Sequence, residues 1–266
     1  MSAQFFSQKI VVRGGGDLAT GVVQKFFRAG FPVVILETSA PSAIRRSVAL
    51  CEAVYDGVAQ VEDMNCRRVS NIDELENCWQ TGIIPLLIDP AGETIGQIRP
   101  SAVIDAILAK RNLGTHRGMA PVTIALGPGF CAGEDVDAVI ETMRGHDLGR
   151  LIFKGCAMPN TGTPGEIGGK SSQRVIHAPV SGTVVHKKQI GDLVESGEVI
   201  FTVGGTDVRA PFTGLLRGLI REGSVVPQGM KIADIDPRTD VDWRTISDKA
   251  RCLGGAALEG YFYLKH

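Results

Sequence analysis

The chain has 266 residues, more than one compact domain usually holds, so two domains are expected. Its 28 basic and 29 acidic residues nearly cancel, which excludes the electrostatic footprint of a nucleic-acid-binding protein or of one that binds anionic membranes. No apolar stretch reaches the roughly 20 residues of a membrane span, and the N-terminus has no signal-peptide pattern. We therefore expect a cytoplasmic protein whose partner is a small molecule or another protein.

The first predicted elements form a strand, a glycine loop and a helix. A β-branched run at residues 9–13 ends in Gly14-Gly15-Gly16, and residues 17–29 then carry an apolar helical face. A second buried strand, residues 31–37, ends on Glu37. This spacing meets the conditions for a dinucleotide-binding βαβ unit, in which small residues admit a phosphate and the acid accepts hydrogen bonds from a ribose. A tight turn that only packs, with Glu37 at a solvated strand end, is the alternative.

Apolar runs of strand length continue at residues 85–89, 102–107 and 122–126, with helical character around residues 71–78. Such alternation predicts an α/β fold with a Rossmann-like, doubly wound parallel sheet. The last of these strands enters a second glycine loop that contains Gly127 and Gly129, and we predict a helix at residues 134–143 after it. Asp135 would cap that helix. The two glycine loops would flank one crevice at the carboxyl ends of the strands.

Several cations and hydroxyls accompany the loops. The pair Arg45-Arg46 either is solvated or grips an anion, and Arg144-Gly145-His146 either ends the predicted helix or faces an anionic ligand. The candidate ligand-binding residues are Arg13, Gly14, Gly15, Gly16, Asp17, Thr20, Glu37, Arg45, Arg46, Gly127, Gly129, Arg144 and His146.

Cysteines and histidines show no metal-site spacing. The six cysteines are scattered without a C-x-x-C pair, so we interpret them as reduced thiols. Cys131 lies inside the second glycine loop, where a reactive thiol would be near a ligand, although packing is the favoured interpretation for a single cysteine. The five histidines have no i, i+4 partner, and no zinc site is indicated.

The pattern changes at residue 174 to short strands and tight turns that repeat. Residues 178–182 recur at 210–214, and residues 191–197 recur at 223–229, both with an offset of 32 residues. The repeat resembles the barrel-sandwich hybrid of the biotinyl and lipoyl domains. The hairpin that would carry the modified lysine, residues 201–209, contains no lysine, so no biotin or lipoate attachment is expected.

These boundaries give four segments. Residues 1–158 form the Rossmann-like nucleotide- or cofactor-binding domain, and residues 159–173 form a Gly/Pro-rich loop that is either a linker or a ligand loop. Residues 174–237 form the barrel-sandwich hybrid domain. A partly helical tail, residues 238–266, packs back on one of the domains.

Several long strings resemble the YqeB family, whose members are named selenium-dependent molybdenum hydroxylase system proteins. They lie at residues 11–21 (VVRGGGDLATG), 44–57, 105–112, 127–150, 159–169 (PNTGTPGEIGG) and 246–259, and together they span most of the chain. The resemblance implies an accessory role in the maturation of molybdenum hydroxylases that carry labile selenium, alongside XdhC-type proteins that handle the molybdenum cofactor. It carries over no catalytic residue.

Three functions follow. The first is a maturation factor that binds a nucleotide-type or molybdopterin-type ligand and acts on a molybdenum hydroxylase or another maturation protein. The second is an NAD(P)-dependent oxidoreductase, in which Glu37 would prefer NAD. The third is a structural adaptor without a ligand. A homo-oligomer is compatible with each.

Overall fold

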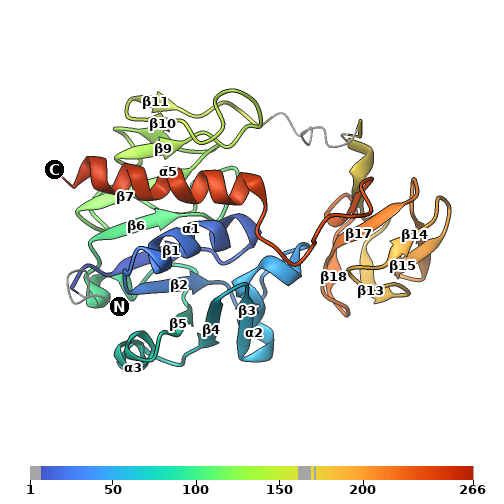
Figure 1. Ribbon diagram of the computed structural model, residues 1–266, viewed down its shortest axis with the longest axis horizontal. Coiled ribbons are helices and arrows are strands. Elements are labelled where there is room, and N and C mark those ends of the chain that lie inside the picture. The colour runs from blue at the N-terminus through green and yellow to red at the C-terminus, as the bar shows by residue number, and fades with distance from the viewer. Residues whose placement is uncertain (1–6, 161–168, 171, 266) are drawn as a thin grey trace. The chain divides into compact units, whose positions relative to one another are not determined.

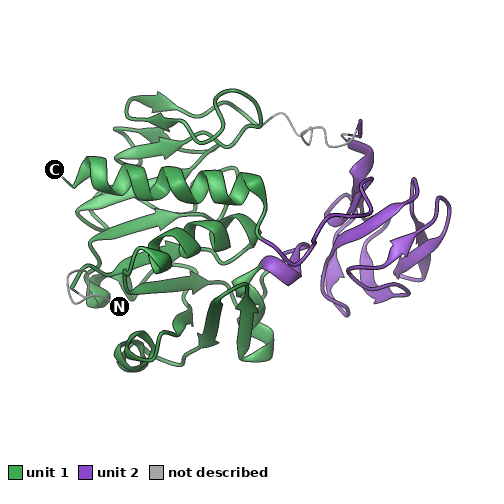
Figure 2. Ribbon diagram, in the orientation of Figure 1, with its two compact units in different colours: residues 1–41, 49–160, 246–266 green, residues 42–48, 161–245 purple. Residues whose placement is uncertain are grey.

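The computed structural model describes residues 7–160, 169–170 and 172–265. The chain divides into two compact units (Figure 2): residues 1–41, 49–160 and 246–266 form the first, and residues 42–48 and 161–245 form the second. The segment 42–48, which the sequence analysis placed in the first domain, thus groups with the second unit, and most of the tail groups with the first. Residues 161–168 of the expected linker loop lie outside the described residues.

The first unit is built on a nine-stranded mixed sheet in the order β10-β9-β7-β6-β1-β2-β5-β4-β3. All neighbours from β4 to β9 pair in parallel, whereas β3 and β10 pair antiparallel at the two edges. The strands are β1 (Ile10–Arg13), β2 (Val33–Glu37), β3 (Val58–Val61), β4 (Met64–Arg68), β5 (Ile84–Ile88), β6 (Ala102–Asp105), β7 (Val122–Leu126), β9 (Ala138–Ile140) and β10 (Leu151–Ile152). A separate two-stranded ribbon joins β8 (Cys131–Ala132) to β11 (Gly155–Cys156). The α/β class expected from the sequence is confirmed.

Helices cover both faces of this sheet. Helices α1 (Asp17–Arg28) and α5 (Asp248–Leu264) lie side by side over one face (Figure 1), where α5 contacts β7 and β9. On the other face, α3 (Leu75–Gln80) and α4 (Ile95–Ile98) pack apolar side chains against Val11, Val34 and Val103. Shorter helical turns lie at α2 (Ala53–Asp56), η2 (Arg46–Val48), η3 (Leu50–Glu52), η4 (Ile72–Glu74) and η5 (Ser172–Arg174).

The backbones of α1 and α5 touch because glycines meet where the helices cross. A Cβ on Gly21 would lie 2.3 Å from the carbonyl oxygen of Ala250, and one on Gly254 would lie 2.2 Å from the oxygen of Gly21. Only glycine permits that approach, since a methyl group there would overlap backbone. The C-terminal helix is thereby fixed over the sheet although it is the last element of the chain.

One predicted element is wrong. The helix expected at residues 134–143 is a turn followed by strand β9, whose Ala138, Val139 and Ile140 are completely buried and continue the sheet beside β7. Asp135 caps no helix: its Oδ2 accepts the N–H of Cys131 at 2.8 Å and fixes the turn. The β-branched pair Val139-Ile140 gains more as a buried central strand than as one turn of helix.

The second unit contains two four-stranded antiparallel sheets, ordered β12-β19-β17-β14 and β16-β15-β13-β18. Strands β13 (Gly182–His186), β14 (Leu193–Val194) and β15 (Val199–Val203) recur 32 residues later as β17 (Gly214–Leu219), β18 (Val225–Val226) and β19 (Lys231–Asp236). Strand β12 (Val175–His177) corresponds to β16 (Thr206–Arg209). The two sheets therefore have equivalent strand orders: replacing each strand of one sheet by its repeat gives the order of the other sheet. This equivalence agrees with the internal repeat in the sequence.

The hairpin between β15 and β16 turns at Gly204-Gly205, where both residues have positive φ (54° and 83°). This is the two-residue turn expected from the sequence, because only glycine adopts that conformation freely at both positions.

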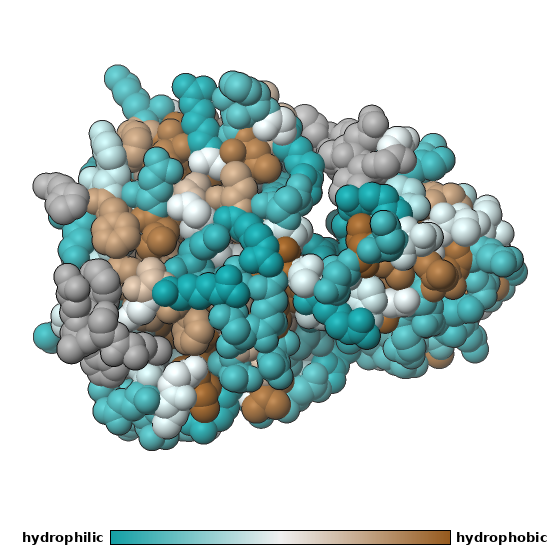
Figure 3. All heavy atoms as spheres, in the orientation of Figure 1, coloured by the Kyte–Doolittle hydropathy of each residue, from teal (hydrophilic) through white to brown (hydrophobic). Residues whose placement is uncertain are grey.

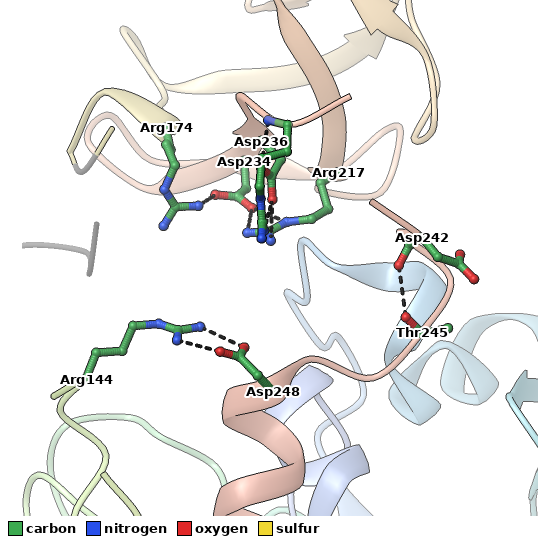
Figure 4. Close-up of polar contacts among 9 residues, drawn as sticks. Arg144, Arg174, Arg217, Asp234, Asp236, Asp242, Thr245 and Asp248 are labelled. Atoms are coloured by element: carbon green, nitrogen blue, oxygen red, sulfur yellow. Dashed lines mark hydrogen bonds and ion pairs between the residues drawn. The ribbon is translucent and has the colours of Figure 1, made fainter. Parts of the chain in front are cut away.

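Buried charges distinguish the second half of the repeat from the first. Asp234 and Asp236 on β19 are 3% and 0% exposed, and they pair with Arg174 and Arg217 (Figure 4). Asp236 also pairs with Arg238. Burial raises the pKa of Asp236, but hydrogen bonds from Arg238 and the charge of Arg217 outweigh it and hold the pKa below its ordinary value. Val185 and Thr202 occupy the equivalent positions of Arg217 and Asp234, so the network is confined to one sheet.

No helix in the described part of the chain is long and apolar enough to cross a bilayer. On the face seen in Figure 3, hydrophobic residues are interspersed among hydrophilic ones, an ordinary pattern for a protein surface.

Candidate functional site

The parallel strands of the first unit bring four charged side chains to one edge of the sheet. Arg13, Glu37 and Asp105 are the last residues of β1, β2 and β6, and Asp89 directly follows β5. The carboxyl ends of neighbouring parallel strands lie along the same edge. Strand β1 has β2 on one side and β6 on the other. Successive strands are therefore added on one side of β1 up to β5 and on its other side from β6 onward.

The three glycines after β1 serve different purposes. A Cβ on Gly14 would lie 3.0 Å from the backbone of Ala106 and Ile107, and one on Gly15 would lie 3.1 Å from the backbone nitrogen of Cys51. Gly16 has no neighbouring atom within 4 Å of the corresponding position. Gly14 and Gly15 are thus needed because other backbone segments of the protein approach them closely, whereas Gly16 borders open space.

Gly16 is also the N-cap of α1, and no side chain caps the helix there. The first turn of a helix presents backbone N–H groups that have no partner within the helix, together with the positive end of its dipole. Asp17 lies in that turn. The start of α1 therefore has the chemistry of an anion site whose approach is open beside Gly16.

Glu37 is turned toward the glycine loop. Its two carboxylate oxygens accept the N–H of Gly15 at 2.7 Å and of Thr38 at 2.8 Å. Burial raises the pKa of Glu37 above its ordinary value, and these two hydrogen bonds oppose the rise only in part. The carboxylate consequently fixes the loop, and one loop amide that the sequence analysis assigned to a phosphate donates to Glu37.

Thr20 lies one turn into α1 and is completely buried. Its Oγ1 donates to the carbonyl of Gly16 at 2.9 Å and accepts the N–H of Leu50 at 3.1 Å. These bonds tie the start of the helix to the segment at residues 50–52, so Thr20 supports the glycine loop from within.

Arg13 and Asp105 face each other across β1 and β6 and are each 1% exposed. The guanidinium of Arg13 donates to Thr115 Oγ1 and, at 2.7 Å, to the carbonyl of Pro90. Thr115 in turn donates to Asp105 Oδ2. Burial raises the pKa of Asp105, against the lowering effects of Thr115, the Ile107 N–H and Arg13. In this structure Arg13 holds the loop at residues 106–115 in place from a buried position.

The second glycine loop ends β7 at the same edge, two strands from β1. A Cβ on Gly127 would lie 2.2 Å from that of Ala157, and one on Gly129, whose φ is +105°, would lie 2.6 Å from the backbone nitrogen of Arg111. Both glycines therefore meet the chain itself.

The remaining candidates lie apart from the glycine loops. Arg144 and His146 follow strand β9 and not the predicted helix, and Arg144 forms a bidentate ion pair with Asp248 at 3.0 and 3.1 Å (Figure 4). His146 is exposed. Arg45 and Arg46 belong to the second unit, where Arg46 Nε donates to the carbonyl of Leu219. Of the predicted candidates, the structure therefore places only those between Arg13 and Thr20, together with Glu37, around the first glycine loop.

The expectation that all cysteines are reduced thiols is wrong. Cys131 and Cys156 form a disulfide across the β8–β11 ribbon, with Cα atoms 4.0 Å apart. The antiparallel pairing sets the two residues directly opposite each other, so that their side chains lie side by side. A separation of 25 residues gave no indication of this in the sequence. Cys51, Cys66 and Cys78 are free and buried, and Cys252 is free and exposed.

Sequence reasoning missed Asp89, Asp105 and Thr115 as residues of this site. Asp105 is the last residue of β6, a buried strand beside β1. An acid at a strand end can indicate a site, but the predicted strand ran to residue 107 and so placed Asp105 in its interior. Thr115 lies in an irregular segment, and no local pattern identified it. Among the described residues, no group of three or more His, Cys, Asp or Glu side chains is placed to hold a metal ion.

The fold and this edge define an α/β protein with a large mixed sheet, a glycine-rich strand-to-helix turn and a second, all-β unit. The chain is 48% identical over 260 residues, 97% of its length, to a protein of Escherichia coli (strain K12) named uncharacterized protein YqeB. The similarity to YqeB extends over nearly the whole of this chain. The chain spans about half, 48%, of that relative's length, and no family model matches the chain.

Similarity to solved structures is slight. An aspartoacylase family protein from Mesorhizobium loti gives a TM-score of 0.25 at 15% identity, covering 52% of this chain and 58% of that one. The product-bound ectoine utilization protein EutE (DoeB) from Ruegeria pomeroyi gives a TM-score of 0.23 at 13% identity, covering 86% and 57%. Scores this low carry no argument about function.

Proposed function

We propose that the first unit is a Rossmann-like domain that binds a phosphate-bearing ligand of the nucleotide or molybdopterin type at the start of α1. We further propose that the protein is an accessory factor in the maturation of selenium-dependent molybdenum hydroxylases. The observation that carries the ligand site is Gly16: it borders open space at the uncapped N-terminus of a helix that follows a central parallel strand.

Strand order supports the Rossmann-like assignment. When the parallel strands other than β4 are numbered in chain order, the sheet reads 3-2-1-4-5-6 from β5 to β9, which is the order of dinucleotide-binding folds. In such folds the ligand lies outside the carboxyl ends of the strands, where the order reverses. That position is the edge between β1 and β6, next to Gly16.

The ligand class follows from the donors available. Backbone N–H groups at the start of α1 suit a phosphate, which both a nucleotide and a molybdopterin carry. Glu37 ends β2 at the place where a ribose-binding acid would stand, and this favours the NAD(P)-dependent oxidoreductase as a second candidate. Because its oxygens already accept the Gly15 and Thr38 N–H groups, a ribose would have to share them.

For the second unit we propose a barrel-sandwich hybrid that binds a partner protein and carries no prosthetic group. The exchanged arrangement of repeated strands in its two sheets supports the assignment, and the hairpin at residues 201–209 has no lysine for attachment. The partner would be a molybdenum hydroxylase or another maturation protein.

A ligand panel tests the proposal. The full chain is purified, co-purifying small molecules are identified by mass spectrometry, and thermal unfolding is followed with molybdopterin nucleotides, AMP, NAD and NADP. A ligand at about 100 times its Kd stabilises a protein by roughly 2.7 kcal/mol, a readily measured shift. Stabilisation by a molybdopterin compound with no response to NAD supports the maturation factor. Stabilisation by NAD together with hydride transfer supports the oxidoreductase, and the absence of any shift contradicts both.

A further inference from the structure

The disulfide ribbon of the first unit lies beside a cavity that the glycine-loop site does not include. The cavity measures about 380 Å³, and its walls include Glu141, Arg150, Phe153, Lys154 and Cys156. This volume falls within the range of small-molecule sites. Strands β9, β10 and β11 lie together at this end of the sheet (Figure 1).

Strand alternation turns the disulfide outward. Ala132 and Ala157, the sequence neighbours of the two cysteines, are buried in an apolar cluster with Phe130, Val136 and Val139. Because successive side chains in a strand point to opposite sides, the cysteines point away from that cluster. Cys156 is exposed, whereas Cys131 is half-buried. Cys156 is therefore the more exposed residue of the pair.

The ribbon is held by more than its disulfide. The turn after Cys131 is closed by the Cys131 N–H to Asp135 Oδ2, by the Asp135 N–H to the Cys131 carbonyl, and by the Gly133 N–H to the Val136 carbonyl. Two residues beyond Cys156, the Met158 N–H donates to Glu141 at 2.8 Å. These bonds and the apolar cluster keep the two sulfurs near each other after reduction, so the pair can cycle between both redox states.

The charges around the cavity select the ligand. Lys154 lines the cavity, and none of the ion pairs found among the described residues involves it. Arg150 and Asp147, which pair with each other at 3.2 Å, also line the cavity. Two cations, Lys154 and Arg150, and the carboxylate of Asp147 in one small cavity complement a molecule that carries both a carboxylate and an ammonium group.

We propose that Cys131 and Cys156 form a redox-active pair that exchanges with a low-molecular-weight amino-acid thiol of the cysteine or glutathione class bound in this cavity. The thiolate of the ligand attacks Cys156 Sγ, forms a mixed disulfide and releases Cys131 as a thiolate, which takes a proton from solvent. A second ligand thiolate attacks the ligand sulfur of the mixed disulfide and releases Cys156. Two ligand thiols are oxidised to their disulfide, and the protein disulfide is reduced to two thiols.

Exchange kinetics on the full chain test the proposal, with glutathione as the probe. In Cys131→Ser, the Cys156 thiol is incubated with oxidised glutathione, and peptide mass spectrometry follows mixed-disulfide formation. Cys252 is the internal reference because it is also free and exposed. We expect Cys156 to react at least ten-fold faster than Cys252. Equal rates at the two cysteines contradict the proposal.

Lys154→Gln separates ligand recognition from simple exposure. In this variant the rate at Cys156 should fall several-fold with oxidised glutathione and stay unchanged with hydroxyethyl disulfide, which carries no charge. A loss of equal size with both reagents would show that the cavity does not select the ligand. If Cys131→Ser does not fold, the same comparison is made on the intact disulfide of Lys154→Gln and the parent chain, with reduced glutathione against 2-mercaptoethanol. A disulfide that resists millimolar glutathione in the parent chain also overturns the proposal.

Discussion

Two glycine-rich loops follow parallel strands at the same edge of the sheet, but their glycines are needed for different reasons. After β7, a Cβ added to Gly127 would lie 2.2 Å from the Cβ of Ala157, and one added to Gly129 would lie 2.6 Å from the backbone nitrogen of Arg111. After β1, Gly16 meets nothing within 4 Å. The first loop leads into a helix, and the second leads into a disulfide-linked ribbon. A glycine cluster in a sequence therefore indicates close approach, and only the structure says whether the approaching group is the protein or a ligand.

The largest effect should come from Gly129. Replacing it with alanine places a Cβ against the backbone of Arg111 and forces a side chain into positive φ. Overpacking and left-handed strain together should destabilise the protein by about 4 kcal/mol. Urea unfolding measures this.

Gly133→Ala is the matched control, because Gly133 has positive φ but no neighbour within 4 Å. The free energy of unfolding of Gly133→Ala should fall by only about 1 kcal/mol, which is the contribution of the backbone strain. Equal losses in the two variants would mean that close packing does not explain the glycine at position 129.

Removal of the disulfide should have the next largest effect on the second loop. The double variant Cys131→Ser, Cys156→Ser frees a loop of 25 residues in the unfolded chain and should lower the free energy of unfolding by about 3 kcal/mol. Urea midpoints with and without a reducing agent measure this. The reducing agent should lower the midpoint of the parent chain and leave the double variant unchanged, whereas an unchanged parent midpoint would refute a stabilising crosslink.

The sequence predicted more of the first loop than of the second. Periodicity placed α1 and β2 correctly, since their apolar patterns are local and regular, and it gave the 32-residue offset between the repeated halves of the second unit. The same reasoning failed at residues 134–143, where pairing with β7 decides that Ala138–Ile140 is a strand. The disulfide, the Arg13–Thr115–Asp105 chain and the grouping of residues 42–48 with the second unit all depend on contacts between distant segments, and no local signal specifies these.

A smaller effect, dependent on pH, should mark the first loop. The pKa of Glu37 is raised by burial above its ordinary value of 4.5, so ionisation is harder in the folded than in the unfolded protein. Its contribution to stability is complete below that ordinary pKa and is lost as the pH rises through the folded-state pKa. Glu37→Gln cannot titrate. The stability of the parent chain relative to this variant should therefore fall as the pH rises from the ordinary pKa of glutamate through the higher folded-state pKa. Urea unfolding across this range measures it, and a difference independent of pH would contradict the assigned shift.

Gly16 gives the most direct test of the ligand site. Its φ of −66° and the open space around it mean that Gly16→Ala should still fold, with a loss of about 1 kcal/mol because alanine is a poorer N-cap than glycine. Gly96→Ala is the matched control, since Gly96 is exposed and also has no neighbour within 4 Å. The measurement is the affinity of each variant for the ligand that stabilises the parent chain. We predict at least a ten-fold loss for Gly16→Ala and none for Gly96→Ala, whereas full affinity in Gly16→Ala would contradict a ligand site at the start of α1.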